Sequence, residues 1–295
     1  MKKPFILNSA DLLDARAIFE PESRGIMVIG ASDTGKTTLI MTIAEILSRQ
    51  YDTAIVDLDM GQSHLGPPTT VAWGKVDKAI KDWSMIEVMD FYFTGTVTPL
   101  GSLLPAITGA KIITEKAFSS ADKVIIDTTG LISGPAGQVL KHFKIDVIRP
   151  DIIIAIESSG ELSHILDPLR FNESPRIIKI PVPPEVRVKT QMKRAEYRFQ
   201  KMMEHLRGAQ VLRIPINEVG IRFMRTPLSS GEEITDRIVS LRDRNNEDIA
   251  LGLLRGIRGG EVMIFTPLRD RGRVASIIIG KAIIDMKNRT LKDSS

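Results

Sequence analysis

The sequence predicts an α/β protein whose core is a mostly parallel sheet flanked by helices, followed by a smaller β-rich domain. From Ile26 onward, short apolar runs rich in β-branched residues alternate with helix-length segments. Such runs are typical of strands that are buried on both faces. Beyond Gly208 this alternation stops, and short strands separated by glycine replace it.

Composition predicts a globular protein with one large and one small domain. The chain has 295 residues, 43% of them hydrophobic, which is enough to bury a substantial core. Its apolar runs are far shorter than the roughly 20 residues of a membrane-spanning helix, so no membrane partner is expected. Asp11 and Asp14 interrupt the amino-terminal apolar residues, so we expect no secretory signal and a cytoplasmic protein. The absence of cysteine excludes disulfides and a thiol nucleophile.

The charge balance leaves the class of partner open. The formal net charge is +4 at pH 7. A mildly basic chain is compatible with a nucleic-acid partner and is equally typical of cytosolic enzymes. Local motifs therefore have to identify the site.

The chain divides into three segments. Residues 1–24 precede the first strand as an amino-terminal extension. Residues 25–207 carry the alternation of strands and helices, and they end in a long two-faced helix predicted over 185–206. Residues 208–295 form the β-rich domain, and its final LKDSS is expected to fray. The basic stripe of the long helix consists of Arg187, Arg194, Arg198 and Lys201.

A phosphate-binding loop follows the first predicted strand. The segment Gly30-x4-Gly35-Lys36-Thr37 lies between an apolar strand and a helix, as such a loop requires. Lys36 reaches the β and γ phosphates, and the Thr37 hydroxyl ligates Mg²⁺. The alternative is a glycine-rich turn with a chance Lys-Thr pair. The residues expected to hold a nucleoside triphosphate are Gly30, Ala31, Ser32, Asp33, Thr34, Gly35, Lys36, Thr37 and Thr38.

Two carboxylates and a glutamine follow the next predicted strand. Asp57 and Asp59 alternate in VDLDMGQS, so both are expected on the same side, beside the loop. A carboxylate there can hold the Mg²⁺ shell or accept a proton, and Gln62 can orient a nucleophile or touch the γ-phosphoryl group. The alternative is that both aspartates only cap the following loop.

A third strand ends in IIDTTGL, which supplies Asp127, Thr128, Thr129 and Gly130. The pattern Asp-x-x-Gly is also the γ-phosphate sensor of GTPases. A GTPase needs an Asn-Lys-x-Asp segment after a later strand to read guanine, and ESSGEL stands at that place. The sequence therefore lacks the segment by which a GTPase recognises guanine.

Functional roles can also be considered for His64, Trp73 and Trp83. A lone histidine in a loop is more often structural or exposed than catalytic. We expect both tryptophans to pack against the core rather than to stack on bases.

In this order the motifs resemble those of the polynucleotide 5′-hydroxyl kinase family, which includes pre-mRNA cleavage-factor kinases, ribosomal-RNA-processing kinases and archaeal relatives. The resemblance runs from about Gly25 to Arg207, and the β-rich tail is similar to the carboxyl-terminal domain of archaeal members. The segments that carry it are GASDTGKTT, DLDMGQS, LGPPTTVAWG, FTGTVTPLGSLLPAITG, DTTGL, ESSGEL and KTQMKRAEYRF.

The resemblance implies transfer of a phosphoryl group from ATP, with Mg²⁺, to the 5′-hydroxyl end of RNA or DNA, in RNA processing or repair. It places Lys36 and Thr37 on the triphosphate and the metal. Asp59 would activate the hydroxyl and contact the metal, and Gln62 would lie beside the transferring group.

The resemblance also implies how the acceptor is held. Thr128, Thr129 and Gly130 match the start of the family's clasp, which grips the acceptor end. The basic helix matches the family's lid, with Arg194 and Arg198 as stabilisers of the transferring charge. An arginine stripe can equally be the solvated face of an amphipathic helix.

Three departures from the family pattern affect these expectations. Leu131 stands where many members have a tryptophan that stacks on an acceptor base, and Glu157-Ser158 stands where archaeal relatives have Gln-Arg. The amino-terminal β domain of the larger relatives is not expected before Gly25.

Two other functions remain as alternatives. The first is a nucleotide-driven switch of the GTPase type, in which water is the acceptor. The second is an RNA-processing scaffold that retains nucleotide and turns it over slowly or not at all. Transfer of label from ATP to a nucleic-acid end separates the kinase from both.

Overall fold

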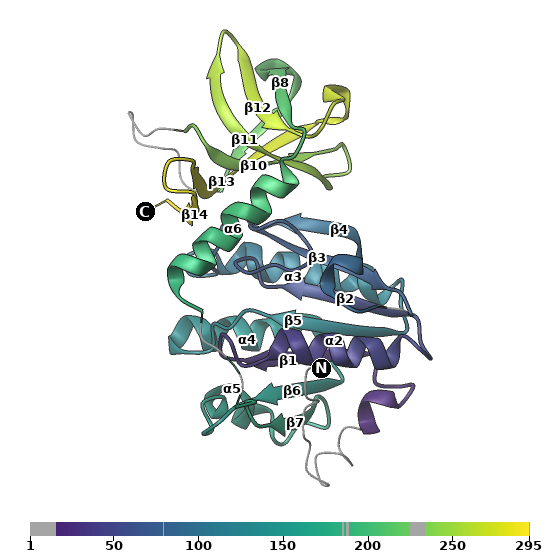
Figure 1. The fold of residues 1–295 in the computed structure, drawn as a ribbon. Helices are drawn as coiled ribbons and strands as arrows, with labels where there is room; N and C mark the ends of the chain where they lie inside the picture. Colours follow the sequence, from purple (N-terminus) through teal and green to yellow (C-terminus); the bar gives the residue numbers. More distant parts are fainter. Residues whose placement is uncertain (1–15, 79, 185, 187–188, 225–233, 295) are drawn as a thin grey trace.

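The computed structural model describes residues 16–78, 80–184, 186, 189–224 and 234–294 (Figure 1). It consists of an α/β domain, a β-rich domain and helix α6 between them. This architecture confirms the predicted fold class.

The α/β domain is built on a seven-stranded sheet in the order β4-β3-β2-β5-β1-β6-β7. Strands β2, β5, β1, β6 and β7 are parallel, whereas β3 runs antiparallel to both of its neighbours. The strands are β1 (Gly25–Gly30), β2 (Thr53–Leu58), β3 (Thr70–Val76), β4 (Glu87–Phe93), β5 (Lys123–Thr128), β6 (Ile152–Ile156) and β7 (Arg176–Ile180).

Helices cover both faces of this sheet. The first face is covered by α2 (Lys36–Leu47) and the short η1 (Arg16–Phe19), and the second by α3 (Leu103–Phe118), α4 (Gly134–Ile148) and α5 (Ser163–Leu166). The remaining short helices are η2 (Trp83–Met85), η3 (Asp167–Leu169), η4 (Ile216–Glu218) and η5 (Arg271–Arg273).

Alternation along β1 shows why the central strands read as continuous apolar runs. Met27 and Ile29 pack in the cluster that contains α3 and α4, while Ile26 and Val28 pack in the cluster that contains α2. All four side chains are fully buried. Because both faces are covered, neither face of the strand requires polar residues.

The β-rich domain is a second sheet in the order β14-β13-β10-β11-β12-β8, with β9 parallel to β13. Its strands are β8 (Gln210–Pro215), β9 (Gly220–Phe223), β10 (Arg237–Arg242), β11 (Asp248–Arg258), β12 (Glu261–Thr266), β13 (Ser276–Asp285) and β14 (Thr290–Asp293). Residues 291–293 of the final segment LKDSS belong to β14 instead of fraying, because β14 pairs with β13 and Asp293 accepts a hydrogen bond from the Val97 N–H at 2.9 Å.

The helix predicted over 185–206 is shorter in the structure, where α6 spans Gln191–His205. The Thr190 hydroxyl caps it by accepting a hydrogen bond from the Lys193 N–H at 3.3 Å. Lys189 is not helical. Arg187 of the predicted basic stripe lies outside the described residues.

Helix α6 connects the two domains (Figure 1). Its residues Phe199 and Met202 are buried in a cluster with Phe93 of the α/β domain and Ile278 of the β-rich domain. Of the apolar residues predicted along one face of this helix, Phe199, Met202 and Leu206 pack in this cluster, whereas Met192 in the first turn is 74% exposed.

A buried ion pair joins the domains at the end of β4. Arg242 binds Asp248 with both a 2.7 Å and a 3.0 Å hydrogen bond, and Asp248 also accepts the Phe93 N–H at 2.8 Å. Nearby, the Lys281 N–H donates to the Gly95 carbonyl at 2.8 Å. The β-rich domain is thus fixed to the edge of the α/β sheet.

Within the described residues, no helix combines the length and the apolar character needed to cross a membrane.

Candidate active site

The three motifs predicted from sequence meet at one edge of the sheet. Strands β1, β5 and β2 are neighbours and parallel, so their carboxyl ends lie together. Asp57 and Asp127 are register partners, and the phosphate-binding loop follows Gly30 on the adjoining strand. Ligands of open α/β sheets bind at this edge.

The loop has the backbone that phosphate binding requires. Asp33 and Gly35 adopt left-handed conformations, with φ of 57° and 91°, so the chain turns sharply before α2 begins at Lys36. A side chain at Gly30 would bring its Cβ to 2.8 Å from the Ile156 carbonyl oxygen. The positive end of the α2 dipole lies at the end of this turn, where it attracts phosphate.

Lys36 is buried in the loop that it belongs to. Its Nζ donates to the carbonyl oxygens of Gly30 at 3.1 Å and Ala31 at 2.6 Å. Burial lowers the pKa of Lys36, while the attraction of Asp127, Asp59 and Asp33 opposes this shift. Two backbone carbonyls thus hold the ammonium group beside the phosphate position.

The two aspartates at the end of β2 have different environments. Asp57 is fully buried, and its Oδ2 accepts hydrogen bonds from Ser63 Oγ at 3.0 Å and the His64 N–H at 2.6 Å. Asp57 therefore caps the loop that follows β2, as the capping alternative states.

Asp59 is half-buried and oriented by its own loop. Its Oδ1 accepts the N–H groups of Gly61 and Gln62, both at 3.0 Å, while Oδ2 accepts no hydrogen bond among the described residues. One oxygen is thus fixed and the other remains available to a metal or a proton. With the Thr37 hydroxyl, this donor set fits Mg²⁺, which binds one or two protein oxygens together with phosphates.

Asp127, which the sequence places at the end of a strand, is a buried carboxylate at the centre of the site. It is 3% exposed, and its Oδ1 has no hydrogen-bond partner among the described residues. Desolvation and the neighbouring Asp57 raise the pKa of Asp127 to about 8, although Lys36 opposes the shift. Burial thus favours the neutral, protonated form of this carboxyl group.

The clasp segment packs directly against the phosphate-binding loop. A Cβ at Gly130 would lie 2.3 Å from Ser32 Oγ and 2.5 Å from Ser32 N, so only glycine permits this approach. Thr128 is fully buried and donates to the Val28 carbonyl at 2.9 Å. The Thr129 hydroxyl is buried without a partner in the described part of the chain. Of the two threonines, Thr129 is the one with unused hydrogen-bonding capacity.

Helix α6 brings Arg194 to the loop. Arg194 Nη2 donates to Asp33 Oδ2 at 2.6 Å, and Arg194 Nε is buried without a partner among the described residues. Arg198 Nε instead donates to the Leu291 carbonyl of β14 at 3.1 Å. The structure thus places the two predicted charge stabilisers differently, with Arg194 on the loop and Arg198 on the β-rich domain.

The remaining sequence features have structural roles in this geometry. His64 lies against Trp83, with ring centroids 4.9 Å apart, and burial lowers the pKa of His64. Trp73 is buried in the core, as expected. Leu131 packs on the small apolar cluster of Met60, Ala106 and Leu140, and Glu157 forms an ion pair with Lys179 at 2.9 Å.

Two site residues were not predicted from sequence, Lys141 and Lys144 of α4. Both are fully buried and point to the ends of β5 and β2. The only sequence signal is a pair of lysines spaced three apart on the apolar face that includes Leu140, Ile145 and Ile148.

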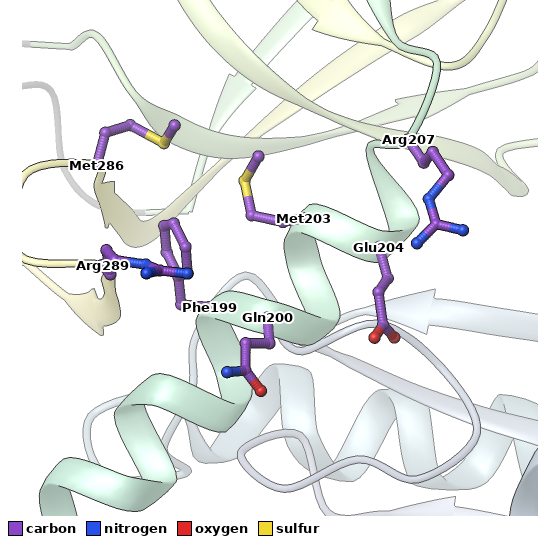
Figure 2. Close-up of a pocket in the computed structure, with 7 residues that line it drawn as sticks. All are labelled: Phe199, Gln200, Met203, Glu204, Arg207, Met286 and Arg289. Atoms are coloured by element: carbon purple, nitrogen blue, oxygen red, sulfur yellow. The ribbon is translucent and has the colours of Figure 1, made fainter.

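A separate open pocket lies beside the second half of α6 (Figure 2). It contains none of the residues predicted to bind nucleotide or acceptor. Its lining comes from α6, from the turn after α6 and from the turn between β13 and β14, and it consists of Phe199, Gln200, Met203, Glu204, Arg207, Met286 and Arg289.

Comparison with solved structures supports the fold assignment. The wild-type Clp1p–Pcf11p (454–563) complex contains a chain that matches with a TM-score of 0.71 at 12% identity, covering 93% of this chain and 78% of that one. At this identity the likeness concerns the fold alone.

Comparison with curated sequences identifies similar proteins. A polyribonucleotide 5′-hydroxyl-kinase of Methanocaldococcus jannaschii is 36% identical over 212 residues, which cover 72% of this chain and 57% of the relative. One of Pyrococcus furiosus is 35% identical over 220 residues, which cover 74% and 60%. The chain thus matches less than two thirds of the length of these relatives.

The family model described as the mRNA cleavage and polyadenylation factor CLP1 P-loop matches residues 30–208, from the phosphate-binding loop to just beyond the end of α6. This range contains every residue that the sequence predicted for the site. The chain belongs to the CLP1 P-loop family.

Proposed function

We propose that this protein is an ATP-dependent, Mg²⁺-dependent kinase that phosphorylates the 5′-hydroxyl end of RNA, or of DNA, in RNA processing or repair. The observation that carries the proposal is the meeting of the phosphate-binding loop, Asp59 and the clasp at one sheet edge, with Arg194 above the loop. Relatives that are 35–36% identical to this chain over the aligned residues are named polyribonucleotide 5′-hydroxyl-kinases.

In this proposal the loop and α2 hold the triphosphate. Lys36 exchanges its two backbone carbonyl partners for oxygens of the β and γ phosphates, which are stronger, charged acceptors. When bound, Mg²⁺ would be held by the Thr37 hydroxyl and, through a water ligand, by Asp59, and it would neutralise charge on the β and γ phosphates.

Asp59 then acts on the acceptor. The 5′ oxygen forms a bond to the γ phosphorus while the bond from that phosphorus to the β–γ bridging oxygen breaks, and ADP leaves. The hydroxyl proton passes to the Asp59 carboxylate through Oδ2, the oxygen that the loop amides leave available. Gln62, whose N–H orients Asp59, lies next to the transferring group.

Arg194 supplies positive charge to the transferring group. Its Nε has no partner among the described residues and its Nη2 lies on Asp33 of the loop, so the guanidinium has hydrogen-bonding capacity left for the γ-phosphoryl oxygens. Phosphoryl transfer depends mainly on positioning and on cations around the equatorial oxygens. The lid helix therefore contributes both charge and exclusion of water.

The test is phosphoryl transfer from γ-labelled ATP to 5′-hydroxyl RNA and DNA oligonucleotides. Label on the 5′ end supports the proposal, and Lys36→Ala should remove it. Lys193→Ala, which changes an exposed lysine of the same lid helix, is the matched control and should retain transfer.

The same experiment distinguishes the kinase from a nucleotide-driven switch and from a scaffold. Release of labelled phosphate with no labelled oligonucleotide would indicate a switch in which water is the acceptor. Tight ATP binding and RNA retention without release or transfer would indicate a scaffold. Either result contradicts the kinase proposal.

A further inference from the structure

Helix α4 carries two lysines whose entire side chains are buried. Lys141 and Lys144 are both 0% exposed, and their spacing of three residues places them on one face of the helix. Lysines are almost never fully buried unless they are paired, because removing an ammonium from water is costly. The contacts that offset this cost show what the two lysines do.

Each ammonium group binds the backbone just before a residue of the proposed active site. Lys141 Nζ donates to the Thr129 carbonyl at 2.5 Å and to Thr128 Oγ1 at 2.8 Å. Lys144 Nζ donates to the Leu58 carbonyl at 3.3 Å. The peptide planes that are held in this way lead directly into Gly130 and Asp59.

Because the peptide group is planar, these contacts restrain the site residues that follow in the chain. The Leu58 carbonyl and the Asp59 N–H belong to one rigid unit, so the Lys144 contact restrains the direction in which Asp59 leaves β2. The Lys141 contact restrains the turn at Gly130 in the same way, where any displacement meets Ser32 of the phosphate-binding loop.

The environment of the two lysines is consistent with a role that depends on their contacts rather than on charge. Burial lowers the pKa of both lysines, and repulsion by Lys144 and Lys36 lowers that of Lys141 further, while Asp59 and Asp127 oppose these shifts. The role of both lysines therefore rests on their hydrogen bonds to the backbone.

We propose that Lys141 and Lys144 are positioning residues of the phosphotransfer site, with Lys144 setting the place of Asp59 and Lys141 setting the clasp turn against the phosphate-binding loop. This inference rests on the proposed kinase function. In this role both lysines act through the backbone that they hold rather than by contact with nucleotide or acceptor.

The structure offers a matched control for buried lysines in general. Lys123, at the opposite end of β5, is also 0% exposed and donates to the Ser23 carbonyl at 2.8 Å. Its replacement removes the same kind of contact far along the strand from the site. A role limited to folding predicts the same behaviour for all three lysines.

The experiment compares Lys144→Met, Lys141→Met and Lys123→Met by single-turnover transfer to 5′-hydroxyl RNA, by nucleotide affinity and by melting temperature. Misplacement of a reacting group by about 1 Å costs about 10²-fold in rate. We expect Lys144→Met to lose about that factor in rate with nearly unchanged ATP affinity, and Lys141→Met to weaken ATP binding by about 10-fold. Lys123→Met should retain both the transfer rate and the ATP affinity, even if its melting temperature changes.

Lys144→Gln, which keeps a donor without the charge, tests the contact itself and should recover part of the lost rate. The inference is overturned when Lys144→Met stays within about threefold of the wild-type rate, or when Lys123→Met loses rate equally.

A readout without turnover separates this inference from the kinase proposal. Hydrogen exchange at the amides of Gly61 and Gln62, which bind Asp59, should rise in Lys144→Met and stay unchanged in Lys123→Met. This comparison decides the positioning role even in a protein that transfers no phosphate to RNA. Unchanged exchange in Lys144→Met contradicts it.

Discussion

Arg194 of the lid helix forms an ion pair with Asp33 of the phosphate-binding loop, with Nη2 2.6 Å from Oδ2. The same carboxylate oxygen accepts the Lys189 N–H at 2.9 Å. The Asp33 side chain is only 8% exposed, so solvent screens this contact weakly. One carboxylate therefore fastens the beginning of α6 to the loop that holds the phosphates.

Removing the charge of Asp33 should loosen the first turn of the lid. Asn is the suitable replacement because it tolerates the left-handed backbone of this residue, with φ of 57°. We expect Asp33→Asn to increase hydrogen exchange over residues 189–194 and to leave residues 200–205 unchanged, since the latter pack against the β-rich domain. Equal exchange in both proteins over residues 189–194 would show that the ion pair does not hold the lid.

The different partners of the two arginines predict different effects on catalysis. Arg194→Ala should reduce turnover by about 10²-fold, the usual effect of losing one preorganised donor, with a smaller change in ATP affinity. Arg198→Ala should have a weaker effect on turnover, because Arg198 is bound to the Leu291 carbonyl. Steady-state kinetics with varied ATP measures both, and a larger loss in Arg198→Ala would reverse this assignment.

The close approach of the clasp to the loop predicts a strong effect of one methyl group. In Gly130→Ala the new Cβ would lie 2.3 Å from Ser32 Oγ, so the phosphate-binding loop has to shift. We expect ATP affinity, measured by titration calorimetry, to fall by at least about 10-fold. The control is Gly220→Ala in β9, where the nearest atom is 3.6 Å away and affinity should not change. An unaltered affinity in Gly130→Ala would mean that the clasp does not support the loop.

The burial of Asp127 predicts a pH dependence of stability. Its pKa is raised from 3.8 to about 8 in the folded protein, so the folded state keeps a proton that the unfolded state releases. The free energy of unfolding should therefore fall as the pH rises from about 4 to about 8, by at most about 1.4 kcal/mol per pH unit. Asp127→Asn, which does not titrate, should have a flatter profile in urea unfolding over this range. Identical slopes would contradict the assignment.

Much of the fold could be predicted from sequence because the parallel strands are buried on both faces. The five parallel strands appear as apolar runs such as IMVIG and DIIIAI. Strand β4 does not, because much of its surface is exposed and Glu87 and Asp90 interrupt its apolar residues. The antiparallel pair β3 and β4 was therefore absent from the prediction.

The candidate site could be predicted where a motif fixes the chemistry. The loop from Gly30 to Thr38 and the placement of Asp59 and Gly130 at the same sheet edge follow from their positions after strands. Lys141 and Lys144 could not be predicted, because lysine normally indicates exposure and only the tertiary structure places them under the strand ends. The partner of Arg198 is also set by a distant strand, β14.

The central claim is tested most directly by analysing the 5′ end of the RNA after a single turnover with ATP. The account predicts that 5′-hydroxyl RNA gains one phosphoryl group by mass spectrometry, that RNA already bearing a 5′-phosphate gains none, and that Asp59→Asn slows the gain by at least about 10²-fold while ATP binding persists. Consumption of ATP with no phosphoryl group on the RNA, or near-normal transfer by Asp59→Asn, would contradict it.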